Sequence, residues 1–153
     1  MPADPAIPYP PLRDPVTSEE AAADLVRGVL GLDDILSGSL LLVLCDDERR
    51  PTVPVLITDV PVTAPVGLVL DHWFEHLSEQ LAEAGRSLVF ARARPGQSFV
   101  VDHDRTWHEA VVRGCRRSGI RLLGAFVVTQ HAAIPFPPPI RPNGPAAGER
   151  IRR

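Results

Sequence analysis

The pattern of apolar and polar residues predicts a first helix soon after the proline-rich start of the chain. Thr17 and Glu20 have the spacing of a capping box, in which Thr17 would be the N-cap. Gly31 predicts the end of the helix. Between these signals the apolar residues recur at helical spacing and would form one buried face: Ala22, Leu25, Val26, Val29 and Leu30.

Two later segments show the same helical period. Val66 to Glu83 carries apolar residues at helical spacing, and Gly85 predicts its end. The next helix would begin at Asp104 as its N-cap and end before Gly119. Five further segments have the length and composition of strands: residues 40–45, 53–60, 88–91, 120–129 and 132–136. Because residues 40–45 and 88–91 are continuously apolar, we expect these two strands to be covered on both faces.

The elements follow one another in the order α-β-β-α-β-α-β-β. This order predicts a single α/β (α+β) domain over residues 17–136, with a mixed sheet of about five strands flanked by three helices. Six of the 17 prolines precede Val16, and six more fall between Pro135 and Pro145. Because proline interrupts both helices and sheets, residues 1–16 and 137–153 are predicted to be extended tails.

Composition narrows the class of protein. A chain of 153 residues with 44% hydrophobic residues can bury one core, and its net charge of -3 gives no overall attraction to nucleic acid. We expect no signal peptide and no membrane contact, because every apolar run is far shorter than the roughly 20 residues that cross a bilayer. Cys45 and Cys115 lie in apolar patterns, which favours buried free thiols and a cytoplasmic protein. All 16 basic residues are arginine, which is typical of a GC-rich genome such as an actinobacterial one.

The junction between the strand at 88–91 and the helix from 104 carries the densest group of chemically active side chains. Arg92 and Arg94 are two residues apart, so they would share one face of an extended segment. If this face points at the start of the helix, Asp104 or Asp102 lies within reach of a bidentate ion pair with Arg94. The alternative is that both arginines are simply exposed to solvent at the entrance of the loop.

Two stretches of the chain resemble proteins of the JAB/MPN fold, in particular their RadC-type bacterial branch. Residues 17–31, TSEEAAADLVRGVLG, are similar to the leading helix of that branch, and residues 118–136, SGIRLLGAFVVTQHAAIPF, are similar to its final helix end and strands. Active members carry H-x-H-P at a strand end and an aspartate at the next helix start, which hold zinc, and an upstream glutamate as base. A related uncharacterised α/β domain with the same ending is the alternative.

At the H-x-H-P position this sequence reads Arg92-Ala93-Arg94-Pro95, and Asp104 matches the aspartate. The position of the base falls near Gly38 or Ser39. A guanidinium has no lone pair to give a metal. The resemblance therefore implies a non-catalytic relative without a cofactor, acting as a protein-interaction or scaffolding module.

A zinc-dependent hydrolase is the competing interpretation. His72, Glu75 and His76 match the H-x-x-E-H motif, in which two histidines one helical turn apart bind zinc and the glutamate acts as base. The nearest analogue of the third ligand is Glu149 in the proline tail, and Asp104 is the other candidate. An ordinary amphipathic helix that exposes two histidines is the alternative. Separately, Asp102, His103 and Asp104 with His108 could bind a divalent ion; the simpler account is an N-cap, a loop histidine and a surface histidine.

A local cluster of arginines offers a third interpretation. The cluster could bind phosphate or a nucleic-acid backbone, or it could simply complement the dipole of a helix C-terminus. Its members are Arg113, Arg116, Arg117 and Arg121. A protein partner or a homodimer remains the expected kind of assembly, with an exposed Trp73 or Phe74 as its first sign.

Overall fold

The structure is a computed structural model that describes residues 14–61, 63–84 and 87–137, without the side chains of residues 77–84. Residues 1–13 and 138–153 of the two predicted tails, and the predicted helix end at Gly85, lie outside the described residues. None of the described helices is long and apolar enough to cross a membrane.

The described elements confirm the predicted mixed α/β fold and add one short helix. In chain order they are α1 (Glu19–Val29), α2 (Leu32–Ser37), β1 (Ser39–Cys45), β2 (Pro51–Ile57), α3 (Val66–Ala84), β3 (Ser87–Ala93), α4 (Asp102–Ser118), β4 (Arg121–Val128) and β5 (Ala133–Pro135). The five strands form one sheet in the order β2-β1-β3-β4-β5. β3 and β4 are parallel, and the other neighbours are antiparallel. β2 lies at an edge of the sheet, which is where a strand tolerates prolines such as Pro54.

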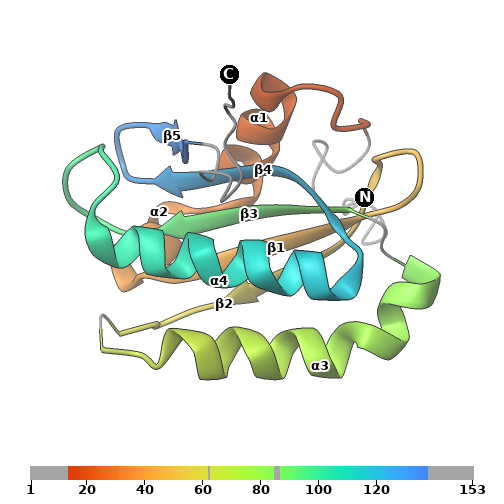
Figure 1. The fold of residues 1–153 in the computed structure, drawn as a ribbon. Coiled ribbons are helices and arrows are strands. Elements are labelled where there is room, and N and C mark those ends of the chain that lie inside the picture. The colour runs from red at the N-terminus through yellow and green to blue at the C-terminus, as the bar shows by residue number, and fades with distance from the viewer. Residues whose placement is uncertain (1–13, 62, 85–86, 138–153) are drawn as a thin grey trace, which may run out of the picture.

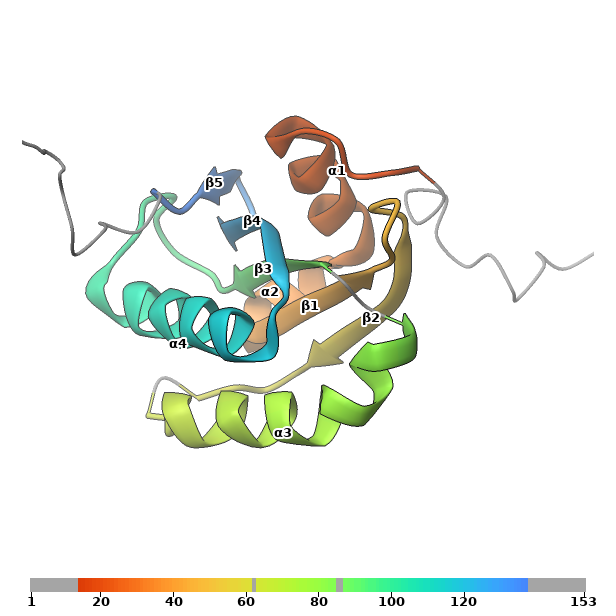
Figure 2. The same ribbon diagram turned by 45° about the vertical axis from the view of Figure 1, so that its right-hand side comes forward.

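Helices cover both faces of the sheet. Figure 1 shows α3 and α4 side by side against one face, while α1 packs on the other, and Figure 2 shows the same layers from a second direction. Alternate residues of the central strands therefore enter two separate cores. Leu42 and Phe90 belong to the core under α3 and α4, whereas Val43 and Val89 belong to the core under α1 and α2.

The helix starts correct two predictions and add a helix that the sequence pattern missed. Ser18, not Thr17, is the N-cap of α1, because its Oγ accepts a hydrogen bond of 3.0 Å from the amide of Ala21. Asp104 is not the N-cap of α4; Val101 is, and Asp104 lies in the first turn. α2 escaped prediction because a helix of six residues is too short to display a period.

The close contact between α3 and α4 depends on the absence of a Cβ atom at Gly114. Gly114 of α4 faces the ring of Phe74 on α3, and a Cβ atom added at Gly114 would overlap that ring. Phe74 is buried, with 3% of its surface exposed, so its ring has little room to move away. The two helices therefore approach closely at this point because position 114 is glycine.

We predict that Gly114→Ala lowers the free energy of unfolding by about 1–3 kcal/mol through overpacking, measured by urea denaturation. Gly67→Ala is the matched control on α3, because a Cβ atom at Gly67 meets nothing within 4 Å. Equal effects of the two substitutions would contradict the close approach.

His108 of α4 couples stability to pH. Its ring stacks on Phe136 with the centroids 4.4 Å apart, and burial lowers the pKa of His108, while Glu109 raises it. An unfolded histidine binds a proton near pH 6.5, and the folded protein resists that proton. The stability from this site is therefore complete above that pH and is lost as the pH falls through the lowered pKa.

We predict that the free energy of unfolding declines as the pH falls below about 6.5, and that His108→Phe makes this decline shallower. Phenylalanine keeps the stacking on Phe136 but cannot take up a proton. Urea titrations at pH 7.5, 6.5 and 5.5 test this, and parallel declines in both proteins would exclude His108 as a cause.

Candidate functional site

A pocket of about 550 Å³ opens at the carboxyl end of β3. One wall is formed by the end of α2 at Leu36 and by Gly38, and Val60 contributes from the segment that follows β2. The other wall is the loop between β3 and α4, with the first turn of α4. Strand ends that lead into helices are common binding positions in α/β domains.

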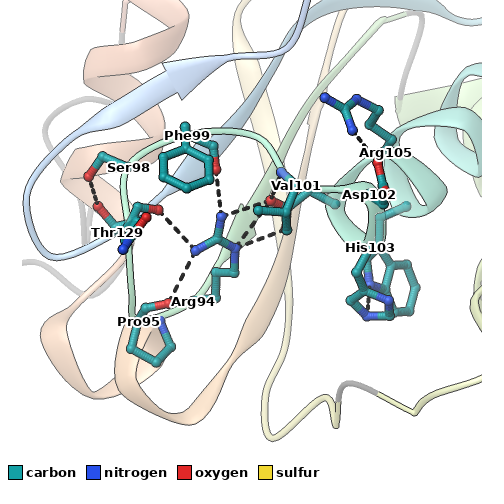
Figure 3. Close-up of polar contacts among 12 residues, drawn as sticks. Arg94, Pro95, Ser98, Phe99, Val101, Asp102, His103, Arg105 and Thr129 are labelled. Atoms are coloured by element: carbon teal, nitrogen blue, oxygen red, sulfur yellow. Dashed lines mark hydrogen bonds and ion pairs between the residues drawn. The ribbon is translucent and has the colours of Figure 1, made fainter.

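Arg94 is the hub of the loop that forms this second wall (Figure 3). Its Nε donates to Oδ1 of Asp104 over 2.9 Å, and its Nη2 donates to Oδ2 over 2.8 Å. Nη1 donates to the carbonyl oxygens of Pro95 and Gln97, and Nη2 also donates to that of Phe99 at 2.8 Å. All five N–H groups of the guanidinium are therefore engaged.

Asp104 links Arg94 to the start of α4. The carboxylate is fully buried, and beside its contacts with Arg94 it accepts a hydrogen bond of 3.0 Å from the amide of Val101. Asp102, the other acidic residue considered from the sequence, pairs instead with Arg105 at the surface. The structure thus contains the bidentate Arg94–Asp104 pair expected from the sequence, and Asp102 has no part in it.

A second contact ties the same loop to the end of β4. The hydroxyl groups of Ser98 and Thr129 lie 2.6 Å apart, and Figure 3 shows the pair at the side of the loop opposite α4. Oγ1 of Thr129 also accepts hydrogen bonds from the amides of His131 and Ala132. The loop is therefore held at its middle by Ser98 as well as by the contacts of Arg94 and Asp104.

Arg92 lies at the base of the pocket and differs sharply from Arg94. It follows Leu88 and Phe90 on the same face of β3, and only 2% of its surface is exposed. Its Nε and Nη1 are buried without a hydrogen-bond partner among the described residues. The guanidinium carbon lies 5.9 Å from the centre of the Trp107 ring.

The electrostatic state of Arg92 reflects this burial. Burial lowers the pKa of Arg92; the negative charge of Asp104 raises it, and the positive charge of Arg94 lowers it further. A guanidinium nevertheless keeps its proton at any ordinary pH. The pocket is therefore lined by a permanent cation whose Nε and Nη1 groups have no hydrogen-bond partner among the described residues.

His103 borders the pocket and is held by Trp107. Nε1 of the indole donates to Nε2 of His103 over 3.3 Å, and the two rings meet edge to face. An accepting Nε2 carries no proton, so the neutral His103 holds its proton on Nδ1.

The residues of the zinc interpretation do not assemble into a metal site within the described part of the chain. His72, Glu75 and His76 all lie on the exposed side of α3, with the imidazole centroids 6.2 Å apart. No group of three or more His, Cys, Asp or Glu side chains among the described residues could hold a metal ion. Glu149, the expected third ligand, lies outside the described residues.

The predicted arginine cluster is exposed but not wholly unpaired. Arg113, Arg116, Arg117 and Arg121 are all exposed. Arg117 forms an ion pair of 2.9 Å with Asp71 of α3. Arg121 lies on β4 and borders a different depression, together with Asp46 and Asp47, so acidic groups offset part of the positive charge.

The two cysteines offer no nucleophile. Both thiols are free and buried. Burial raises the pKa of Cys45 and of Cys115 to about 12, and the nearby carboxylate of Asp46 adds to the effect at Cys45. A thiol reacts as its thiolate, which these values exclude near neutral pH.

Comparison with known proteins does not identify the chain. No protein-family model matches it, and no curated protein sequence is significantly similar to it.

The sequence pattern identified both arginines as candidate site residues but did not identify the apolar residues that line the pocket. Leu36, Phe99 and Val101 are exposed apolar residues that border it. A possible signal was the run Phe99-Val100-Val101, which is apolar although it lies between a Gly/Pro turn and a helix. Leu36 gave none, because α2 itself was not predicted.

We predict that Asp104→Ala lowers the free energy of unfolding by about 3–5 kcal/mol, because it leaves a largely buried guanidinium without its carboxylate. Asp102→Ala is the control, since its ion pair lies at the surface, and it should leave stability unchanged. Urea unfolding of both variants measures the difference. Similar unfolding curves for the two variants would show that the buried pair is not what holds the loop.

Proposed function

We propose that this chain is a non-catalytic binding module that recognises an anionic group of its ligand through Arg92. The observation that carries the proposal is the buried guanidinium whose Nε and Nη1 have no partner among the described residues. Leaving a buried donor unpaired costs roughly 1–3 kcal/mol, and more when it is charged. An anion in the pocket would supply both the acceptors and the missing charge.

The other polar side chains of the pocket support binding rather than catalysis. Asp104 is bound by Arg94 and by the amide of Val101. His103 accepts from Trp107 through Nε2, and the hydroxyl of Ser37 donates to a backbone carbonyl oxygen. Each described side chain here that could serve as a base or nucleophile thus has a structural contact.

The resemblance to RadC-type JAB/MPN proteins is part of this proposal. In active members two histidines would stand where this chain has Arg92 and Arg94. Here the ion pair from Arg94 to Asp104 joins strand to helix, as zinc would in those members, and Arg92 is left for a ligand. The chain would then be a metal-free, protein-binding relative, working in the cytoplasm, where its buried free thiols are stable.

We predict that Arg92→Met stabilises the protein while abolishing anion binding. Methionine fills similar space without burying a charge, so the free energy of unfolding should rise by about 1–3 kcal/mol. Urea unfolding measures that change. Titration of isotope-labelled wild-type and variant protein with benzoate and with phosphate, followed by the backbone amide NMR signals of Gly38 and Phe99 at the pocket, measures binding.

Arg113→Met is the matched control, because Arg113 is an exposed arginine of α4 that does not border this pocket. It should change neither stability nor the anion-dependent shifts. If Arg92→Met destabilises the protein and anion-dependent shifts persist, Arg92 is a structural residue and the proposal fails.

A further inference from the structure

We propose that the ligand of this pocket is a monocarboxylate carried on an apolar body; this inference rests on the proposed function and names its ligand class. Two sources share that chemistry, a small apolar carboxylic acid and the free C-terminus of a polypeptide that ends in an apolar residue. Three features of the pocket support the assignment.

The first feature is the charge of the site. Arg94 has no N–H left to donate, because its contacts with Asp104 and with loop carbonyl oxygens use all five. The Val101 amide at the start of α4, a group that often binds anions, already donates to Asp104. Arg92 and Arg94 with Asp104 carry a net charge of +1 (two positive and one negative), so a single negative charge balances the site. A phosphate dianion would face Asp104 with only Arg92 free to bind it.

The second feature is an exposed apolar rim. Leu36 and Phe99 each expose 53% of their surface, and Val101 exposes 37%. All three border the pocket, Leu36 from α2 and the other two from the loop before α4. Exposed apolar side chains that gather round a cavity are typical of a surface that a ligand covers. The rim therefore favours an apolar body attached to the carboxylate.

The third feature is that both walls are held in place before any ligand arrives. On the loop wall, the carbonyl oxygen of Phe99 accepts a hydrogen bond from Arg94, and the amide of Val101 donates one to Asp104. These bonds fix the backbone at both rim residues of the loop. On the opposite wall, the amide of Val60 donates to the carbonyl oxygen of Gly38 over 2.9 Å. Gly38 has φ of 81°, and a Cβ atom there would lie 3.2 Å from the carbonyl oxygen of Val60 and 3.9 Å from Nη1 of Arg92. Glycine keeps the space beside Arg92 free of a side chain, and a fixed site loses little entropy on binding.

The experiment compares four probes by isothermal titration calorimetry on the full chain. 3-Phenylpropanoate carries both a carboxylate and an apolar body. 3-Phenylpropanol lacks the charge, propanoate lacks the ring, and inorganic phosphate is the competing anion. We expect one saturable site for 3-phenylpropanoate, with at least tenfold weaker binding of the other three, and loss of binding in Arg92→Met.

Rim variants test the apolar part separately from the charge. Leu36→Ser and Phe99→Ser should each weaken 3-phenylpropanoate at least fivefold without weakening propanoate. Leu68→Ser is the matched control, because Leu68 is exposed by 70% but lies on α3 and does not border this pocket. Equal losses in all three variants would overturn the role of the rim.

The outcomes separate this inference from the proposed function. If phosphate or propanoate binds through Arg92 as tightly as 3-phenylpropanoate, the ligand class is wrong while anion recognition stands. If no anion binds, both proposals fail. The peptide Gly-Gly-Gly-Phe and its C-terminal amide distinguish the two sources: tighter binding of the free peptide than of 3-phenylpropanoate assigns a polypeptide C-terminus, and the reverse assigns a small acid.

Discussion

The ion pair between Arg94 and Asp104 joins the end of β3 to the first turn of α4, and the pocket is built around it. Asp104 is fully buried and also binds the Val101 amide, so one carboxylate completes the helix start and neutralises the arginine. The same guanidinium gathers three loop carbonyl oxygens. A buried pair of this kind stabilises a fold only when its other hydrogen bonds are satisfied as well, and here they are.

Arg92, two residues earlier, is a buried charge whose hydrogen-bonding groups are not all satisfied. It lies on the same face of β3, is almost fully buried, and has unpaired donors at Nε and Nη1 within the described structure. Under the proposed function, Arg94 contributes to stability and Arg92 to recognition of the ligand. Proteins tolerate such a cost at positions where a ligand later removes it, which is why apolar substitutions at these sites tend to stabilise while they impair function.

Much of the fold was predictable from local pattern because its main elements are long and clearly periodic. The buried strand around Phe90 and the amphipathic helix containing Trp107 follow directly from the spacing of apolar residues. The errors fall where a local signal was short or shared between neighbours. Thr17 and Ser18 are both good N-caps, and α2 is too short to show a period, so only the three-dimensional structure distinguished the alternatives.

The sequence by itself determined that Arg92 and Arg94 share one face, because side chains alternate along a strand with a period of two. It also predicted an acidic residue at the start of the next helix, within reach of the arginines only if their face points at that helix. Tertiary structure decided which arginine is paired and which is not. That outcome depends on where the loop directs its carbonyl oxygens. Leu36, from a distant segment, borders the same pocket as Phe99, and such proximity between distant segments leaves no periodic trace in the chain.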